Sequence, residues 1–256
     1  MKKFSKSILI FLTIILTSFL LFIITACDGD DDDNDSNDVN PKGKWMAVLD
    51  EEIEAPSPET VMAKAILMEV TADDSTIIFY DNEANQVSGM KSDYTVDVDA
   101  FQLTSTHMWL DRDPEEGITF TGTGWYEIPD EVETLNPEFT IDDDTMAIDK
   151  DGMKFSLIKT DFSVLSDLVG SWSITDSDVT FNSDGTFSYS HGGTTGSGTW
   201  EASGTESGYL RQIITEMSDD PDCSYYECIN PYVLVGDTLT VYFDFDLSTG
   251  YDYIKE

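Results

Sequence analysis

The chain has 256 residues, with 51 acidic side chains against 13 lysines and arginines, so its formal net charge is −38 and its pI is about 4.1. A surface this acidic repels nucleic acid phosphates and anionic lipid headgroups, which argues against both as direct partners of the folded part. It favours cations, basic protein partners or saline surroundings.

The first 26 residues predict an export signal. Three lysines form a basic start, and residues 7–26 carry no charge, as in secretory signals. The run ends in Ile24-Thr25-Ala26-Cys27, which resembles the bacterial lipobox. This resemblance implies cleavage before Cys27, diacylglycerol on its thiol and acylation of the new amino terminus. Two alternatives remain, a plain secretory signal and an uncleaved anchor, since about 20 apolar residues suffice for a transmembrane helix.

Residues 27–41 are expected to form the lipidated cysteine and a flexible acidic tether. Seven aspartates fall between Asp28 and Asp38, and blocks of like charge repel and stay solvated. The tract lacks the glycine and glutamate positions of an EF-hand loop, so a spacer is favoured over a calcium site. The mature chain from Cys27 has 10 basic and 51 acidic side chains, a net charge of −41. Two or three acyl chains make a stable anchor, so we expect attachment to a cell-envelope membrane, with the outer membrane favoured.

Two cysteines remain after Cys27, namely Cys223 and Cys228. A close pair in an exported protein is most simply a disulfide. The alternatives are a metal site and a redox pair, but structural zinc needs four ligands and the thioredoxin-type spacing is C-x-x-C. The sequence therefore predicts a stapled loop.

Residues 42–256 predict an almost entirely β structure. Short runs of branched and aromatic residues alternate apolar with polar, as half-buried strands do. Turn sequences separate them, such as NSDG at 182–185, where a glycine after aspartate supplies a positive φ. Only FSVLSDLV at 162–169 is expected to form a turn or two of helix. The expected strands are 75–80, 94–98, 118–120, 146–148, 153–157, 179–181, 187–189 and 239–243.

The β region also repeats, which predicts two domains, 42–160 and 161–256. Four short matches occur in the same order in each half. They are GKW with GSW at 43 and 170, GTGWYE with GSGTWE at 122 and 196, DDTMAI with GDTLTV at 143 and 236, and FSLIKT with YDYIKE at 155 and 251.

A Gly-x-Trp that opens a meander of short strands resembles the small lipocalin-like domains of bacterial lipoproteins. The resemblance covers most of 168–256 and the ends and middle of 43–160. It implies two up-and-down antiparallel β-barrels, in which inward side chains fill the base or bound a cavity. It also implies that Trp172 and Trp45 pack across the closed ends. Neither closing strand has the arginine that covers this tryptophan in eukaryotic lipocalins.

The two histidines, His107 and His191, are the candidates for catalysis. No G-x-S-x-G motif accompanies either one, and no phosphate-binding or zinc-protease motif appears. The NSDG turn begins like a calcium loop but has His191 at its twelfth position, which favours a tight turn. Paired acids such as Glu115 and Glu116 are more typical of a solvated loop. We therefore expect no enzyme, no cofactor and no metal site.

The leading functional hypothesis is a membrane-anchored lipoprotein that binds a small, partly apolar ligand in a β-barrel. We expect a cavity in the first domain rather than in the second, because the longer strands of the first domain enclose more volume. The alternative is an envelope or cell-surface interaction protein with filled barrels and an acidic surface that prefers cations or a basic protein partner.

Overall fold

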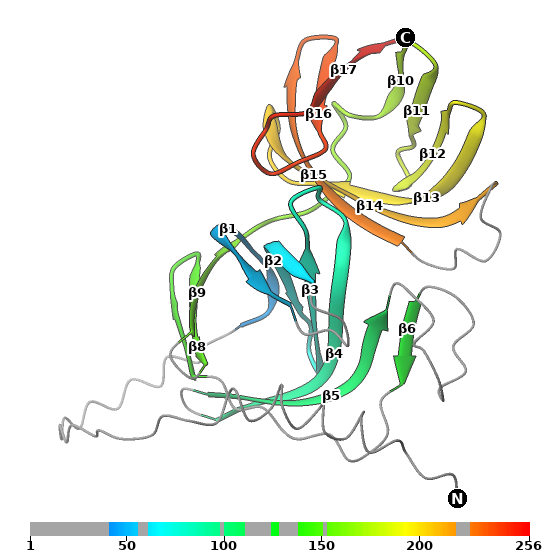
Figure 1. Ribbon diagram of the computed structural model, residues 1–256. Coiled ribbons are helices and arrows are strands. Elements are labelled where there is room, and N and C mark those ends of the chain that lie inside the picture. The colour runs from blue at the N-terminus through cyan, green and yellow to red at the C-terminus, as the bar shows by residue number, and fades with distance from the viewer. Residues whose placement is uncertain are drawn as a thin grey trace, which may run out of the picture.

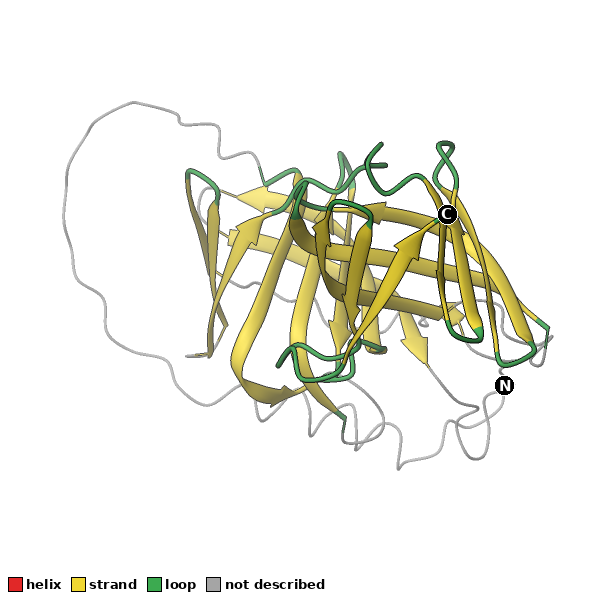
Figure 2. Ribbon diagram, turned by 90° about the horizontal axis from the view of Figure 1, so that it is seen from above, coloured by secondary structure: helices red, strands yellow, loops and turns green. Residues whose placement is uncertain are grey.

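The computed structural model describes residues 41–55, 61–97, 100–110, 124–127, 138–150, 153–218 and 226–256. Every regular element in these residues is a β-strand, and the strands form two separate antiparallel sheets (Figure 1; Figure 2). No helix in the described part is long and apolar enough to cross a bilayer. The all-β fold predicted from the sequence is therefore confirmed.

The second sheet is a closed up-and-down barrel in which each strand pairs with its neighbours along the chain and β17 returns to β10. Its core is aromatic, with Trp172, Phe181, Phe187 and Trp200 each at most 3% exposed. The strands are β10 (Gly170–Ile174), β11 (Ser177–Phe181), β12 (Thr186–His191), β13 (Thr194–Ala202), β14 (Ser207–Met217), β15 (Tyr226–Val235), β16 (Thr238–Tyr242) and β17 (Gly250–Lys255).

The first sheet has nine strands, of which eight form a ring that we call the first barrel. The ring runs β1-β2-β3-β4-β5-β7-β8-β9, and β5 and β7 are joined by one registered pair, Ala100 with Glu138. Strand β6 pairs with the far end of β5. The strands are β1 (Gly43–Glu54), β2 (Met62–Val70), β3 (Asp74–Tyr80), β4 (Gln86–Asp97), β5 (Ala100–Leu110), β6 (Gly124–Glu127), β7 (Glu138–Asp142), β8 (Thr145–Lys150) and β9 (Met153–Lys159).

The two barrels share one construction at the base. The indole N–H of Trp45 donates to the carbonyl of Pro41 at 2.7 Å, and that of Trp172 donates to the carbonyl of Leu168 at 2.8 Å. Each tryptophan pairs with a lysine of the closing strand, whose ammonium lies 5.5 Å from the ring centre for Lys159 and 5.0 Å for Lys255. A cation over an aromatic face is attracted to the ring, so each lysine covers the tryptophan of its own barrel.

Three of the four sequence matches occupy equivalent places, and one does not. The backbone N–H of Lys159 donates to the carbonyl of Asp144 at 2.7 Å, and the backbone N–H of Lys255 donates to the carbonyl of Asp237 at 2.9 Å. The closing strands, and the turns to which they bond, are therefore equivalent in the two barrels. Trp125, however, lies in β6 after the long β4–β5 hairpin, whereas Trp200 lies in β13, the fourth strand of its barrel. The GTGWYE and GSGTWE pairing was therefore wrong.

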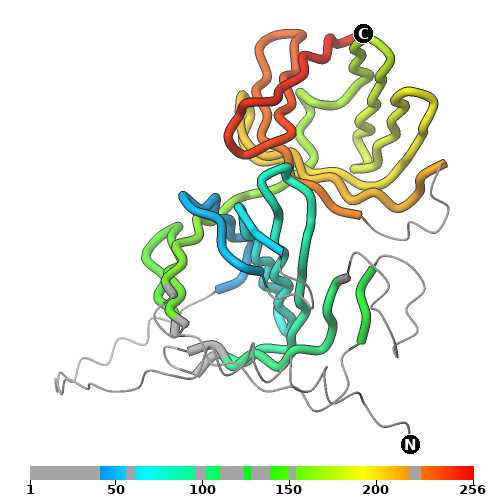
Figure 3. The backbone as a smooth tube through the Cα atoms, viewed as in Figure 1, coloured from blue at the N-terminus to red at the C-terminus, as the bar shows by residue number. Residues whose placement is uncertain are grey.

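The segment between the barrels contains a turn and no helix. The backbone N–H groups of Leu168 and Val169 bond carbonyls three residues earlier, and Ser163 forms a β-bridge with Ala202. This bridge holds the linker against β13, so a second helical turn does not form. The chain path through the linker is visible in Figure 3. The predicted strand at 118–120 lies outside the described residues.

The barrels are docked along a continuous seam. Met46, Leu67, Ile78 and Tyr80 on the outer face of β1–β3 form one apolar cluster with Ile229 and Phe245 of the second barrel. The β3–β4 turn adds backbone hydrogen bonds, because the carbonyl of Ala84 accepts from Ile229 at 3.0 Å and that of Asn82 accepts from Phe245 at 3.1 Å. The docking fixes the two barrels relative to each other.

Candidate functional site

The core of the second barrel is mainly aromatic, whereas the core of the first barrel mixes large side chains with small ones. In the second barrel Phe181 packs against Trp200 with ring centres 4.9 Å apart and against Phe187 at 6.3 Å. In the first barrel Ala47 and Ala63 are buried inward residues of β1 and β2, beside larger inward residues such as Trp45, Ile66 and Met68. Bulky aromatic side chains fill an eight-stranded interior, whereas small ones leave volume for a ligand.

The end of the first barrel away from Trp45 is apolar. Leu49, Ile53, Ile148 and Phe155 are partly buried and pack on the core of the barrel. They come from β1, β8 and β9, and they lie toward the ends of these strands that are distant from Trp45. Apolar side chains are the usual lining of small-molecule sites.

Three serines lie side by side on the inner face of the same barrel. Ser92 of β4 is the direct cross-strand partner of Ser75 in β3 and of Ser105 in β5. Ser75 also pairs with Val70, a member of the barrel core, which places this row on the inside. We call Ser75, Ser92 and Ser105 the serine row. The sequence alone does not reveal this row, because the serines are far apart in the sequence and only the strand register brings them together.

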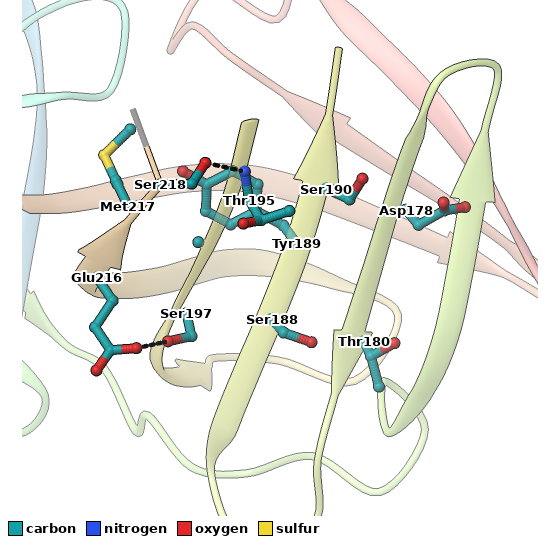
Figure 4. A pocket seen from close by; sticks show the side chains of 11 residues that line it. Asp178, Thr180, Ser188, Tyr189, Ser190, Thr195, Ser197, Glu216, Met217 and Ser218 are labelled. Atoms are coloured by element: carbon teal, nitrogen blue, oxygen red, sulfur yellow. Dashed lines mark hydrogen bonds between the residues drawn. The ribbon is translucent and has the colours of Figure 1, made fainter. Parts of the chain in front are cut away.

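A second candidate site is a depression of about 500 Å³ over β11–β14 (Figure 4). Asp178, Thr180 and Ser188 alternate with the core residues Val179, Phe181 and Phe187, so they lie on the outer face of the barrel. Glu216 accepts a hydrogen bond from Ser197 at 3.1 Å. The remaining lining residues are Tyr189, Ser190, Thr195, Gly196, Met217 and Ser218. This polar groove offers hydroxyls and two carboxylates, which suit a hydrogen-bonding or cationic partner.

A buried ionic network lies in the seam. Arg211, with its side chain 7% exposed, donates from Nε to Glu227 at 2.7 Å and from Nη1 to Glu201 at 2.7 Å. Lys44 of the first barrel donates to Glu201 at 2.5 Å, and the Tyr80 hydroxyl donates to Glu227. Charged residues of both barrels thus meet in one network, and a buried charge of this kind depends on its partners.

The network shifts the pKa values of its members. Burial by itself raises the pKa of the Glu201 carboxyl, but hydrogen bonds and charge from Lys44 and Arg211 outweigh it and hold this pKa below its usual value. Burial alone lowers the pKa of Arg211, but Glu227, Tyr80 and Glu201 more than compensate, so it is raised. Both shifts favour the charged forms of Glu201 and Arg211.

The residues singled out from the sequence do not converge on a reaction centre. His107 lies in β5 and His191 at the end of β12, on different barrels. In the NSDG turn, Gly185 has φ +82° and the Asp184 carboxylate accepts from the backbone and hydroxyl of Thr186. The hydrogen bonds of that carboxylate therefore stabilise the turn. Within the described residues, no group of three His, Cys, Asp or Glu side chains gathers as a metal site would require.

The predicted lipid and disulfide sites are only partly described. Cys27, Cys223, Glu115 and Glu116 lie outside the described residues. Cys228 lies in β15, and burial, together with the charge of Glu227, raises the pKa of its thiol to about 12. A thiol with so high a pKa is a poor nucleophile and metal ligand in its protonated form. The pairing of Cys223 with Cys228 stays a prediction.

Comparison of the chain with protein-family models, with curated proteins and with solved structures finds no match in any of the three. The function of the protein is therefore inferred from the residues and geometry of this chain.

Proposed function

We propose that the chain is an exported lipoprotein, anchored to the cell envelope through Cys27, that binds a small, partly apolar molecule in its first barrel without catalysing a reaction. The lipobox-like end of the apolar run and the acidic tract after it support the anchor. Two or three acyl chains at one cysteine hold a protein stably on a membrane.

One observation supports the ligand function above the others, namely the small inward side chains of the first barrel. Ala47, Ala63 and the serine row stand there among larger core residues, and β1 and β4 have 12 residues each against 5 in β10 and β11. Longer strands with smaller inward residues enclose more unfilled volume. The partly buried apolar side chains at the barrel end supply the walls of such a site.

The anchor is tested by expressing the full chain in bacteria and separating it with a detergent that partitions into two phases. We expect the mature protein in the detergent phase, with a mass that shows cleavage before Cys27 and added acyl groups. The variant Cys27→Ala should lose the acyl mass and the signal cleavage that depends on it. A wild-type chain without acyl mass contradicts the anchor.

The ligand function is tested by displacement of the neutral fluorescent dye N-phenyl-1-naphthylamine. We expect saturable binding of one dye per chain that is weakened by Phe155→Asp in the first barrel. The matched control is Phe243→Asp, since Phe243 is 40% exposed on the second barrel. Equal binding by both variants, or no saturable binding by the wild type, contradicts a ligand site in the first barrel.

The polar groove favours a second function, in which the second barrel binds a basic protein partner at the envelope surface. Asp178 and Glu216 line the groove, and the chain carries a strong negative charge that attracts such a partner. A polylysine peptide is the probe, and Asp178→Asn with Glu216→Gln should weaken its binding more than the control pair Asp142→Asn with Glu54→Gln outside the groove. Equal weakening would show only general attraction to the acidic surface.

A further inference from the structure

The serine row is nearly removed from solvent. Ser75, Ser92 and Ser105 are 1%, 3% and 7% exposed. They are successive neighbours across β3, β4 and β5, and side chains directly opposite each other in an antiparallel pair have Cβ atoms roughly 4.5–5.5 Å apart. Three hydroxyls therefore lie in one short line on the inner wall of the first barrel.

These hydroxyls have unused hydrogen-bonding capacity. The Ser75 Oγ is buried without a partner in the described part of the chain. Ser92 and Ser105 are 3.5 Å apart at their Oγ atoms, and Ser105 donates at 2.8 Å to the sulfur of Met90, a weak acceptor. Buried hydroxyls usually find good partners, and an unsatisfied one calls for an explanation such as a bound molecule.

The surroundings of the row are apolar and uncharged. Ile77 and Met90 are the inward neighbours two residues along β3 and β4, and Tyr94 and Leu103 pair just beyond the row on β4 and β5. None of these four neighbours is an aspartate, glutamate, lysine, arginine or histidine. A carboxylate or ammonium in such a place would lose its hydration without gaining a counter-charge, whereas a neutral polar group would lose little and gain hydrogen bonds.

We propose that the serine row binds a neutral hydroxyl, amide or carbonyl group of an otherwise apolar ligand. The inference rests on the proposed ligand function of the first barrel, and it adds the chemical class and the orientation of the ligand. The apolar body of the ligand lies along inward residues such as Ala47 and Met90, toward Leu49 and Phe155. Its polar group meets Ser92 and Ser105. Each serine hydroxyl both donates and accepts, so alcohols and amides are suited equally.

The test uses the full mature chain and displacement of N-phenyl-1-naphthylamine by decan-1-ol and by decanoate, which have equal chain length. We expect decan-1-ol to displace the dye at a concentration at least roughly tenfold below that of decanoate, because desolvating a lone charge costs more than desolvating a hydroxyl. In the double variant Ser92→Ala with Ser105→Ala, the affinity for decan-1-ol should fall roughly three- to tenfold, the usual effect of losing one or two neutral hydrogen bonds.

The control is Ser207→Ala, which removes an exposed hydroxyl at the start of β14 in the second barrel and should leave both affinities unchanged. Dye affinity is measured directly for every variant, so a loss of folding shows as a loss of dye binding. The proposed role of the serine row is wrong if the double variant binds decan-1-ol as tightly as the wild type, or if decanoate binds as tightly as decan-1-ol. Either result leaves the ligand function of the first barrel intact. A chain that binds no dye contradicts the ligand function itself, and the proposal with it.

Discussion

At the scale of single residues, the first barrel contains a hydroxyl that works against its stability. The Ser75 Oγ is buried without a partner, and an unsatisfied buried hydroxyl costs about 1–3 kcal/mol. We expect Ser75→Ala to raise the free energy of unfolding by about 1 kcal/mol, as measured by urea denaturation. Ser188→Ala, on the exposed outer face, should change it by less than about 0.5 kcal/mol. A clear loss of stability in Ser75→Ala would show that the hydroxyl has a partner.

The tryptophans at the barrel bases are residues whose place could be foreseen. Gly-x-Trp in GKW and GSW predicted two buried tryptophans, and Trp45 and Trp172 are at most 1% exposed. Their lysine partners could also have been found, because FSLIKT and YDYIKE carry a lysine at the same position. The serine row could not, because the strand register that unites it depends on a β-bulge between Lys91 and Ser92.

At the scale of elements, the hairpin between β11 and β12 depends on one glycine. Gly185 has φ +82°, and its added Cβ would lie 3.2 Å from a methyl of Val164. A residue with a Cβ is strained in this region by roughly 1–2 kcal/mol. We expect Gly185→Ala to lower the free energy of unfolding by about that amount in urea titrations.

Ser190→Ala, in the adjoining strand, is the control for the hairpin and should leave the free energy of unfolding nearly unchanged. A neutral effect of Gly185→Ala would mean that the turn adopts another conformation. The sequence predicted this turn and its positive φ, since Asn-Ser-Asp-Gly between alternating runs leaves few options. The same local reasoning failed for 162–169, where tertiary pairing of Ser163 with Ala202 replaces the expected helix.

At the scale of the whole molecule, the seam depends on a buried arginine. Removal of Arg211 would leave Glu227, whose side chain is 0% exposed, without its main counter-charge. Breaking a buried pair from one side typically costs about 3–5 kcal/mol. We expect Arg211→Met to destabilise the protein by that amount and the added change Glu227→Gln to restore part of it, measured by urea denaturation.

Lys154→Met is the control for the seam, because Lys154 is 79% exposed and pairs with Asp149 at 3.1 Å. Exposed pairs contribute about 0–1 kcal/mol. If Arg211→Met cost no more than Lys154→Met, the network would not hold the barrels together. No local sequence pattern reveals this seam, since its members come from several strands of both barrels.

The seam also predicts the response to acid. The pKa of Glu201 is lower in the folded protein than the ordinary 4.5. A carboxyl of this kind stabilises the fold above its unfolded pKa, and the contribution is lost as pH falls through the folded value. We expect the melting temperature to decrease as the pH is lowered beneath about 4.5. In Glu201→Gln, which is less stable at neutral pH, this decrease should be less steep. Identical acid profiles would contradict a role for Glu201.

Native mass spectrometry can test together whether the protein is lipid-anchored and whether it holds a small molecule in its first barrel. The mature protein is extracted from membranes in mild detergent and weighed before and after collisional activation. We expect acyl mass at the amino terminus and a neutral molecule of a few hundred daltons that leaves on activation. An acylated chain that carries nothing would contradict the ligand function and favour the polar groove of the second barrel as the working surface.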